Sequence, residues 1–131
     1  LKNWPDKEVI YCTYGADLSY KKSRLARDLF RRVNYGLPLS EESSSVSTWN
    51  VGGKQIRGNF QATGIGGSIT GTGADLMILD DLFKNHIEAE SAAQRDKVWE
   101  FWESTLLTRL MPGASVILIM TRWHEDDIAG R

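Results

Sequence analysis

Residues 74–81 read Ala74-Asp75-Leu76-Met77-Ile78-Leu79-Asp80-Asp81. Four apolar residues in this stretch lead directly into two adjacent carboxylates. An apolar run of this kind is typical of a strand that is buried on both faces of a parallel sheet covered by helices. Because open α/β sheets bind their ligands at the carboxyl ends of such strands, we expect the two acids at a ligand-binding edge.

Asp80 and Asp81 repel each other unless a cation lies nearby. A magnesium ion that carries a nucleotide phosphate is the commonest such cation. The pair therefore has the form of a Walker B motif, in which the first acid serves the magnesium shell and the second polarises the attacking water. Paired Asp residues also form turns and helix caps, so the eight residues alone leave both interpretations open.

The composition is that of an ordinary globular domain. The 131 residues are 41% hydrophobic and 25% charged, with a formal net charge of −1, which gives no overall attraction to nucleic acid or membrane. The apolar run 116–120 is too short to span a bilayer, and the first residues lack the apolar core of a signal peptide. The single Cys12 excludes an internal disulfide, and we interpret it as a small core residue.

Strands and helices alternate along the chain. The expected strands are 8–14, 46–51, 54–60, 74–79 and 115–120, and the expected helices are 17–33 and a segment that begins near Asn85 or Ser91 and ends near Leu110. We predict a polar loop at 40–45, a tight hairpin turn at Gly52-Gly53 and a helix stop at Pro112-Gly113. This order predicts an α/β fold with a mostly parallel sheet and an inserted β-hairpin.

The helix over 17–33 has two faces. We expect its apolar residues to pack on the sheet: Leu18, Leu25, Ala26, Leu29 and Val33. The opposite face is basic and either contacts a phosphate backbone or is merely solvated: Lys21, Arg24, Arg27 and Arg31.

The glycine-rich stretch 64–73 precedes a strand and does not open a helix, so we interpret it as a flexible loop or an irregular edge strand and not as a phosphate cradle. The Gly-x-x-x-x-Gly-Lys-Ser/Thr motif of a phosphate-binding loop does not occur in the chain. Gly53-Lys54 is followed by Gln55, which cannot supply the magnesium-binding hydroxyl.

Thr121 and Arg122 end the second apolar strand. If that strand lies beside 74–79, the hydroxyl and the cation are placed to sense the γ-phosphate of a nucleotide. Alternatively, Arg122 only stacks on Trp123. The following stretch 124–127, His-Glu-Asp-Asp, fits the acidic first turn of a helix better than a set of metal ligands.

Further motifs follow one another in a fixed order and spacing. They are Ala62-Thr63-Gly64, Gly66-Gly67, Thr70-Gly71, the stretch 73–81, Glu88-Ala89, Ser91, Arg95, Lys97-Val98-Trp99, Thr108-Arg109-Leu110, Pro112-Gly113 and the stretch 121–127. Together they resemble the large terminase subunits of tailed bacteriophages and prophages, over residues 64–131. The N-terminal half is a weaker match.

The resemblance implies part of a P-loop-type ATPase sheet and a role in the ATP-driven packaging of viral double-stranded DNA into a capsid. It implies that Asp80 serves the magnesium of bound ATP through water and that Asp81 is the catalytic carboxylate. Thr121 and Arg122 match the motif that couples hydrolysis to DNA movement. Thr72 stands where many relatives have Arg.

By the same resemblance, residues 1–131 are the central part of the motor domain, without the phosphate-loop strand and the nuclease domain. We expect this piece not to hydrolyse ATP alone. The missing strand belongs beside 115–120, so we expect an exposed apolar edge there that drives self-association. The implied partners are viral DNA, the portal protein, the small terminase subunit and further copies of the chain, with no membrane. The implied location is the host cytoplasm and, transiently, the capsid portal.

Three alternatives stay open. Another P-loop motor, such as a helicase, shares the two acids but uses a different motif at the end of the second strand. A metal-dependent nuclease would bring Asp80, Asp81 and Asp126 around two ions. A non-catalytic prophage remnant would fold and bind partners without binding ATP.

Overall fold

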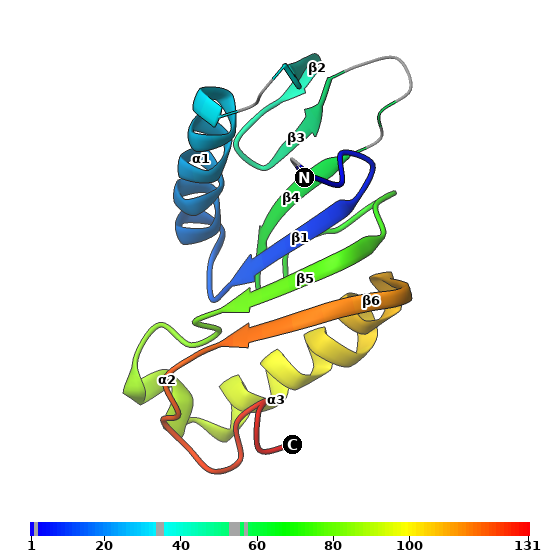
Figure 1. Cartoon of the computed structure of the whole chain (residues 1–131). Helices are drawn as coiled ribbons and strands as arrows, with labels where there is room; N and C mark the ends of the chain where they lie inside the picture. Colours follow the sequence, from blue (N-terminus) through cyan, green and yellow to red (C-terminus); the bar gives the residue numbers. More distant parts are fainter. Residues whose placement is uncertain (2, 34–35, 53–55, 57) are drawn as a thin grey trace.

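The computed structural model describes residues 1, 3–33, 36–52, 56 and 58–131 (Figure 1). Six strands form one sheet in the order β2-β3-β4-β1-β5-β6. The strands are β1 Glu8–Thr13, β2 Leu39–Ser44, β3 Thr48–Val51, β4 Asn59–Gly64, β5 Ala74–Asp80 and β6 Leu110–Ile119. The helices are α1 Ala16–Val33, α2 His86–Glu90 and α3 Ala92–Phe101, and α3 continues as a π-helical turn Trp102–Leu106 and a 3₁₀ turn Leu107–Arg109.

The sheet is mixed and mostly parallel. Strands β4, β1, β5 and β6 run parallel to one another, whereas β3 is antiparallel to β4 and β2 is antiparallel to β3. The arrowheads of β1, β5 and β6 therefore point to the same edge of the sheet (Figure 1). The predicted α/β class and the hairpin are confirmed, and the carboxyl end of β5 lies between those of its two neighbours.

The larger core lies between the sheet and the α3 segment. Ile10 and Cys12 of β1 and Met77 and Leu79 of β5 are buried there with the apolar side chains of the helix: Val98, Phe101 and Leu106. Burial raises the pKa of the Cys12 thiol to about 12. The thiol is therefore neutral at physiological pH, which confirms Cys12 as a core residue.

Helix α1 covers the opposite face of the sheet, but the side of the helix that faces the sheet is not the predicted one. Ser19 and Ser23 are buried, whereas Leu25 and Leu29 are 61% and 59% exposed. The Ser23 hydroxyl accepts a hydrogen bond from Trp49 Nε1 at 3.1 Å, and the Ser19 hydroxyl donates to the carbonyl of Thr63. The prediction that the apolar stripe packs on the sheet is wrong for Leu25 and Leu29, whereas Ala26 does pack against the buried cluster of Phe30, Trp49 and Val51. Small hydroxyl side chains permit a close approach that the leucines do not.

Two predictions around the hairpin are also wrong. The serine-rich stretch 40–45 was expected to be a loop, but 39–44 pairs as β2 against β3. The amide of Val51 donates to the carbonyl of Gly58 at 2.8 Å, so β3 and β4 are joined by a longer connection than the two-residue turn at Gly52-Gly53. Gly53 itself lies outside the described residues.

The helix before β6 begins and ends differently from the simplest expectation. The Asn85 side chain caps α2 by accepting from the Glu88 amide at 3.0 Å. Ser91 is the residue before α3, but its side chain makes no capping bond, so helices begin after both candidate sites and only Asn85 caps through its side chain. The helical turns end at Arg109, and Pro112-Gly113 lies inside β6 and not at a helix stop. Proline is tolerated here because β6 is an edge strand, and Gly113 has a φ of +79° near a register shift.

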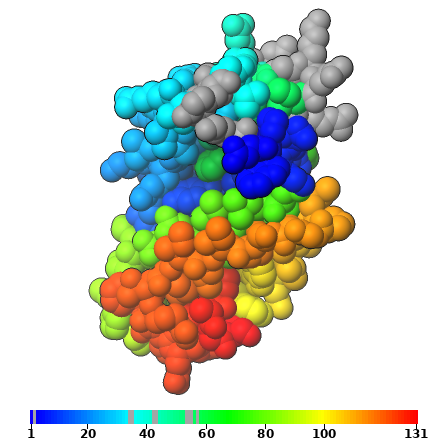
Figure 2. Space-filling view, viewed as in Figure 1, coloured from blue at the N-terminus to red at the C-terminus, as the bar shows by residue number. Residues whose placement is uncertain are grey.

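β6 forms one edge of the sheet and is largely uncovered. Its four residues from Val116 to Ile119 are between 37% and 51% exposed, and Figure 2 shows the strand, in orange, lying open across this face. The apolar sequence resembles that of a central strand, but the structure confirms the exposed edge expected from the resemblance. In the part of the chain that the structure describes, the helices are too short or too polar to cross a membrane.

Candidate functional site

The two acids lie where β5 leaves the sheet. Asp80 is the last residue of β5 and is opposite Ile119 of β6, and Asp81 follows at the edge. The next two residues, Leu82 and Phe83, are buried in the larger core. Because the strand fixes the residue before the pair and the core fixes the residues after it, the carboxylates have a defined place at the carboxyl edge of the sheet.

Asp80 is half-buried and bonded to the neighbouring strand. The Tyr11 hydroxyl of β1 donates a hydrogen bond to Asp80 Oδ2 at 2.5 Å. Burial, and then the bond to Asp80, raises the pKa of Tyr11 well above its usual value. The phenol therefore stays protonated and acts as a donor to the carboxylate at neutral pH.

Asp81 has a left-handed backbone, with a φ of +45°. Its amide donates to the carbonyl of Ile119 at 2.9 Å, and its carbonyl accepts from the amide of Tyr14 at 3.0 Å. The ends of β6 and β1 thus hold Asp81 in a conformation that non-glycine residues rarely adopt. Its side chain is exposed, so the carboxylate is free to meet a ligand.

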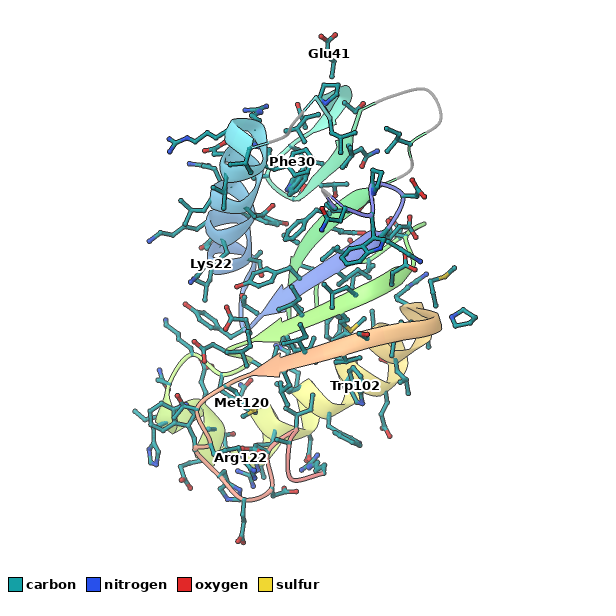
Figure 3. All side chains as sticks on the ribbon, viewed as in Figure 1. Lys22, Phe30, Glu41, Trp102, Met120 and Arg122 are labelled. Carbon is teal, nitrogen blue, oxygen red and sulfur yellow. The ribbon has the colours of Figure 1, made fainter. Side chains whose placement is uncertain are left out.

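Thr121 and Arg122 follow β6 at the same edge as the two acids. Thr121 is two residues beyond Ile119, the partner of Asp80, and its side chain is exposed. Arg122 turns toward the C-terminal residues, and Figure 3 places it in the loop beyond the end of β6. Its Nε donates to Asp127 Oδ2 at 2.6 Å, and its Nη2 donates to the carbonyl of Glu125 at 3.3 Å. The structure therefore gives Arg122 a carboxylate partner in place of the expected stack on Trp123, whose ring contacts His86.

The stretch 124–127 does not begin a helix, so the predicted acidic helix turn is wrong. Asp127 is fully buried and accepts hydrogen bonds from the amides of Ala129 and Gly130, both at 3.0 Å. Asp126 pairs with Arg131 at 2.7 Å and with Arg95 at 3.3 Å, and these bonds lower the pKa of its carboxyl. Arginine side chains and backbone amides thus donate hydrogen bonds to Asp126 and Asp127 and take the place of the first turn of a helix. We call residues 124–131, held in this way, the stapled turn.

A magnesium site at this edge needs few protein ligands, because Mg²⁺ keeps several waters and binds one or two carboxylates together with substrate phosphates. The hard oxygens of Asp80 and Asp81 fit that requirement. Within the described ranges, no group of three or more His, Cys, Asp or Glu side chains could hold a metal ion. The nuclease alternative is therefore not supported, since its third acid, Asp126, pairs with Arg95 and Arg131.

The basic residues of α1 do not form one set. Lys21, Arg24 and Arg31 are exposed, as expected. Only 14% of the Arg27 side chain is exposed, and its Nη1 donates to the carbonyl of Ser44 in β2 at 2.5 Å. Arg27 therefore links α1 to β2 through this hydrogen bond and is a poor candidate for a phosphate contact.

The glycine-rich stretch after β4 lies beside the start of α1. It lines a pocket of about 440 Å³ together with Ala16, Tyr20 and the end of β4. The stretch is a loop, as predicted, and Gly64 packs so closely on Ala16 that a side chain there would meet its amide. The pocket lies on the β4 side of β1, whereas Asp80 and Asp81 lie on the β5 side.

Sequence reasoning missed Tyr11 as a residue of the site. The spacing of the chain places it in a strand, but the contact depends on β1 being the neighbour of β5 and on Tyr11 sharing a face with Asp80. An aromatic hydroxyl inside the predicted strand 8–14 is the signal that the sequence carries.

The family model described as terminase large subunit, T4likevirus-type, N-terminal, matches residues 1–129. No curated protein matches the chain.

Proposed function

Because this family model covers nearly the whole chain, the chain belongs to the terminase large-subunit family, and we propose that it forms the ATP-hydrolysing part of a viral DNA-packaging motor. Membership of the family suggests a role in phage DNA packaging, and the large subunit of this family is generally an ATPase. The finer assignment to particular residues rests on the carboxyl edge of the sheet.

One observation carries this proposal. Asp80 ends a parallel strand and Asp81 follows it at the same edge. The Asp80 carboxylate accepts a hydrogen bond from Tyr11 of β1, and the backbone of Asp81 is bonded to Ile119 of β6 and to Tyr14, just after β1. Ligands of open α/β sheets bind at such edges. An Asp that serves magnesium through water and a second acid that orients the attacking water are two of the parts that phosphoryl transfer to water uses, beside a phosphate-binding loop.

The proposed roles follow from the surroundings of each acid. Asp80 is held by Tyr11, so its carboxylate would serve the water shell of a bound magnesium ion from a fixed position. Asp81 is exposed and accepts a proton as the water oxygen bonds to the γ-phosphorus and the bond to the β,γ-bridging oxygen breaks. Magnesium, when bound, neutralises charge on the phosphate oxygens. Water, and no further reactant, balances the reaction.

The hydrogen bond between Asp81 and Ile119 of β6 supports a role of this edge in coupling ATP hydrolysis to DNA movement. Any shift of the Asp81 backbone acts directly on Ile119, because the two residues share a hydrogen bond. Thr121 and Arg122 come immediately after Ile119, and Arg122 is bonded to the stapled turn through Asp127. Hydrolysis at Asp81 therefore has a short physical route to the C-terminal residues, in line with a coupling role for Thr121 and Arg122.

We propose that the full-length protein has the partners and the location that the resemblance implies. The motor acts on viral double-stranded DNA as a ring of identical subunits, with the portal protein and the small terminase subunit as partners. It works in the host cytoplasm and, during packaging, at the capsid portal. The exposed basic residues of α1 are the candidate DNA contacts: Lys21, Arg24 and Arg31.

A packaging assay tests the function. Empty capsids, DNA and the full-length subunit that carries this chain are mixed with ATP and Mg²⁺, and DNA protected from nuclease is measured. We expect protection to require ATP and to be lost in Asp80→Asn. Glu100→Gln, which removes an exposed carboxylate of α3, is the matched control and should package normally. Packaging by Asp80→Asn at the normal rate would contradict the proposal.

A further inference from the structure

We propose that Tyr11 is a positioning residue for Asp80 and that a row of aromatic side chains across the α1-covered face of the sheet holds it in place. This inference rests on the proposed function, because it assigns to Tyr11 the task of orienting the carboxylate that serves magnesium. It adds a residue from β1 to a site otherwise built from the ends of β5 and β6.

The strand register places Tyr11 within reach of Asp80. β1 pairs in parallel with β5, and Tyr11 is opposite Ile78, two residues before Asp80. Alternate residues of a strand share a face, so Tyr11, Ile78 and Asp80 lie on the same side of the sheet. The Tyr11 hydroxyl reaches diagonally from β1 to β5 and donates a hydrogen bond to Asp80 Oδ2.

The ring of Tyr11 is held by its neighbours. It stacks on Phe60 of β4 with ring centroids 6.2 Å apart, and Phe60 stacks on Trp49 of β3 at 4.9 Å. Trp49 contacts Phe30 of α1 at 5.6 Å, and Figure 3 shows Phe30 between α1 and the strands. Trp49 is only 2% exposed and its Nε1 donates to Ser23.

This row, Tyr11-Phe60-Trp49-Phe30, joins four elements of the fold. Tyr11 is itself only 8% exposed, and its ring is stacked on that of Phe60. The hydroxyl is thereby fixed in space, and it fixes one oxygen of Asp80 in turn. Hydrogen-bond partners that orient a metal-serving group typically contribute 10- to 100-fold to metal affinity or activity.

The test compares three variants of the full-length subunit, with Mn²⁺ as the probe for the magnesium site. Mn²⁺ binding in the presence of ATP is measured by electron paramagnetic resonance, alongside the Mg²⁺ dependence of turnover and the melting temperature. Tyr11→Phe removes only the hydroxyl. We expect it to weaken Mn²⁺ binding about tenfold, to lower kcat at limiting Mg²⁺, and to regain much of that kcat at high Mg²⁺ with an unchanged melting temperature.

Tyr20→Phe is the matched control, because it removes a hydroxyl from α1 on the far side of β1, beside the glycine-rich loop. It should bind Mn²⁺ as the unmodified protein does. Asp80→Asn separates the two claims. If Asp80→Asn loses Mn²⁺ binding and Tyr11→Phe does not, the positioning role is wrong and the proposed function stands. If Asp80→Asn binds Mn²⁺ normally, the proposed site itself fails.

Discussion

The amide of Asp81 donates to the carbonyl of Ile119 at 2.9 Å, so the residue that follows β5 is bonded to the end of β6. With the second bond, from the Tyr14 amide, this contact holds Asp81 at a φ of +45°. Strained backbone at an exposed carboxylate is typical of functional sites, where the surrounding structure stabilises a conformation needed for the chemistry. Here it also connects the proposed catalytic acid to the strand before Thr121.

The left-handed conformation of Asp81 predicts a strong dependence of stability on the side chain. Asp81→Val should lower the free energy of unfolding by about 1–2 kcal/mol, because a β-branched residue is poorly accommodated at positive φ. Asp81→Asn should change it by less than about 0.5 kcal/mol, since Asn tolerates this region. Urea denaturation of the chain measures both values, and equal stability of the two variants would contradict the backbone assignment.

The buried Asp127 predicts a stability contribution from the stapled turn. Its carboxylate accepts bonds from Arg122 and from two backbone amides, so Asp127→Ala leaves three donors without their acceptor. We expect a loss of about 2–3 kcal/mol in the free energy of unfolding. Asp126→Ala is the control: its side chain is 45% exposed, so its loss should lower the free energy of unfolding less than Asp127→Ala does. Similar losses for both variants would argue against the turn described here.

The open edge at β6 predicts self-association of the isolated chain. Sedimentation velocity should detect species larger than a monomer whose share grows with concentration, because an apolar edge strand offers unpaired backbone groups. Ile117→Lys places a charge on the edge and should restore the monomer. Leu25→Lys places the same charge on the exposed side of α1 and should leave association unchanged. A monomer at every concentration would contradict this prediction.

The two kinds of arginine on α1 predict different defects. Arg24→Ala should weaken DNA binding by the full-length subunit and reduce the slope of log affinity against log salt by about 1, with normal stability. Arg27→Ala should keep that salt slope but lower the free energy of unfolding by about 1 kcal/mol, because it removes the bond to Ser44. DNA titrations at several salt concentrations distinguish them, and equal salt slopes for Arg24→Ala and the unmodified protein would exclude Arg24 as a contact.

Strands β5 and β6 and the two acids at the end of β5 could be predicted because their signals are local. The apolar run before Asp80 marks a parallel strand by itself, and the same holds for the run before Thr121. Once the two strands are parallel neighbours, their carboxyl ends must meet at one edge. The exposure of β6 was predictable from the resemblance alone, since its apolar sequence favours a central position.

The errors share a different cause. The hydrophobic spacing predicts that Leu25 and Leu29 pack on the sheet, yet Ser19 and Ser23 make this contact. The two serines are buried there because their hydroxyls form hydrogen bonds with Thr63 of β4 and Trp49 of β3. The polar composition of 40–45 predicts a loop, but residues 39–44 form a strand because they pair with β3. The Tyr11 contact depends on strand order and face, which spacing along the chain does not encode.

The most direct test of the central claim is a single-turnover measurement of ATP hydrolysis by the full-length subunit carrying Asp81→Asn, with ATP and Mn²⁺ binding measured on the same sample. We expect normal binding and a loss of turnover of at least about a hundredfold, because Asn accepts no proton from the attacking water. Turnover within a few-fold of the unmodified protein, with binding intact, would show that Asp81 does not activate the water.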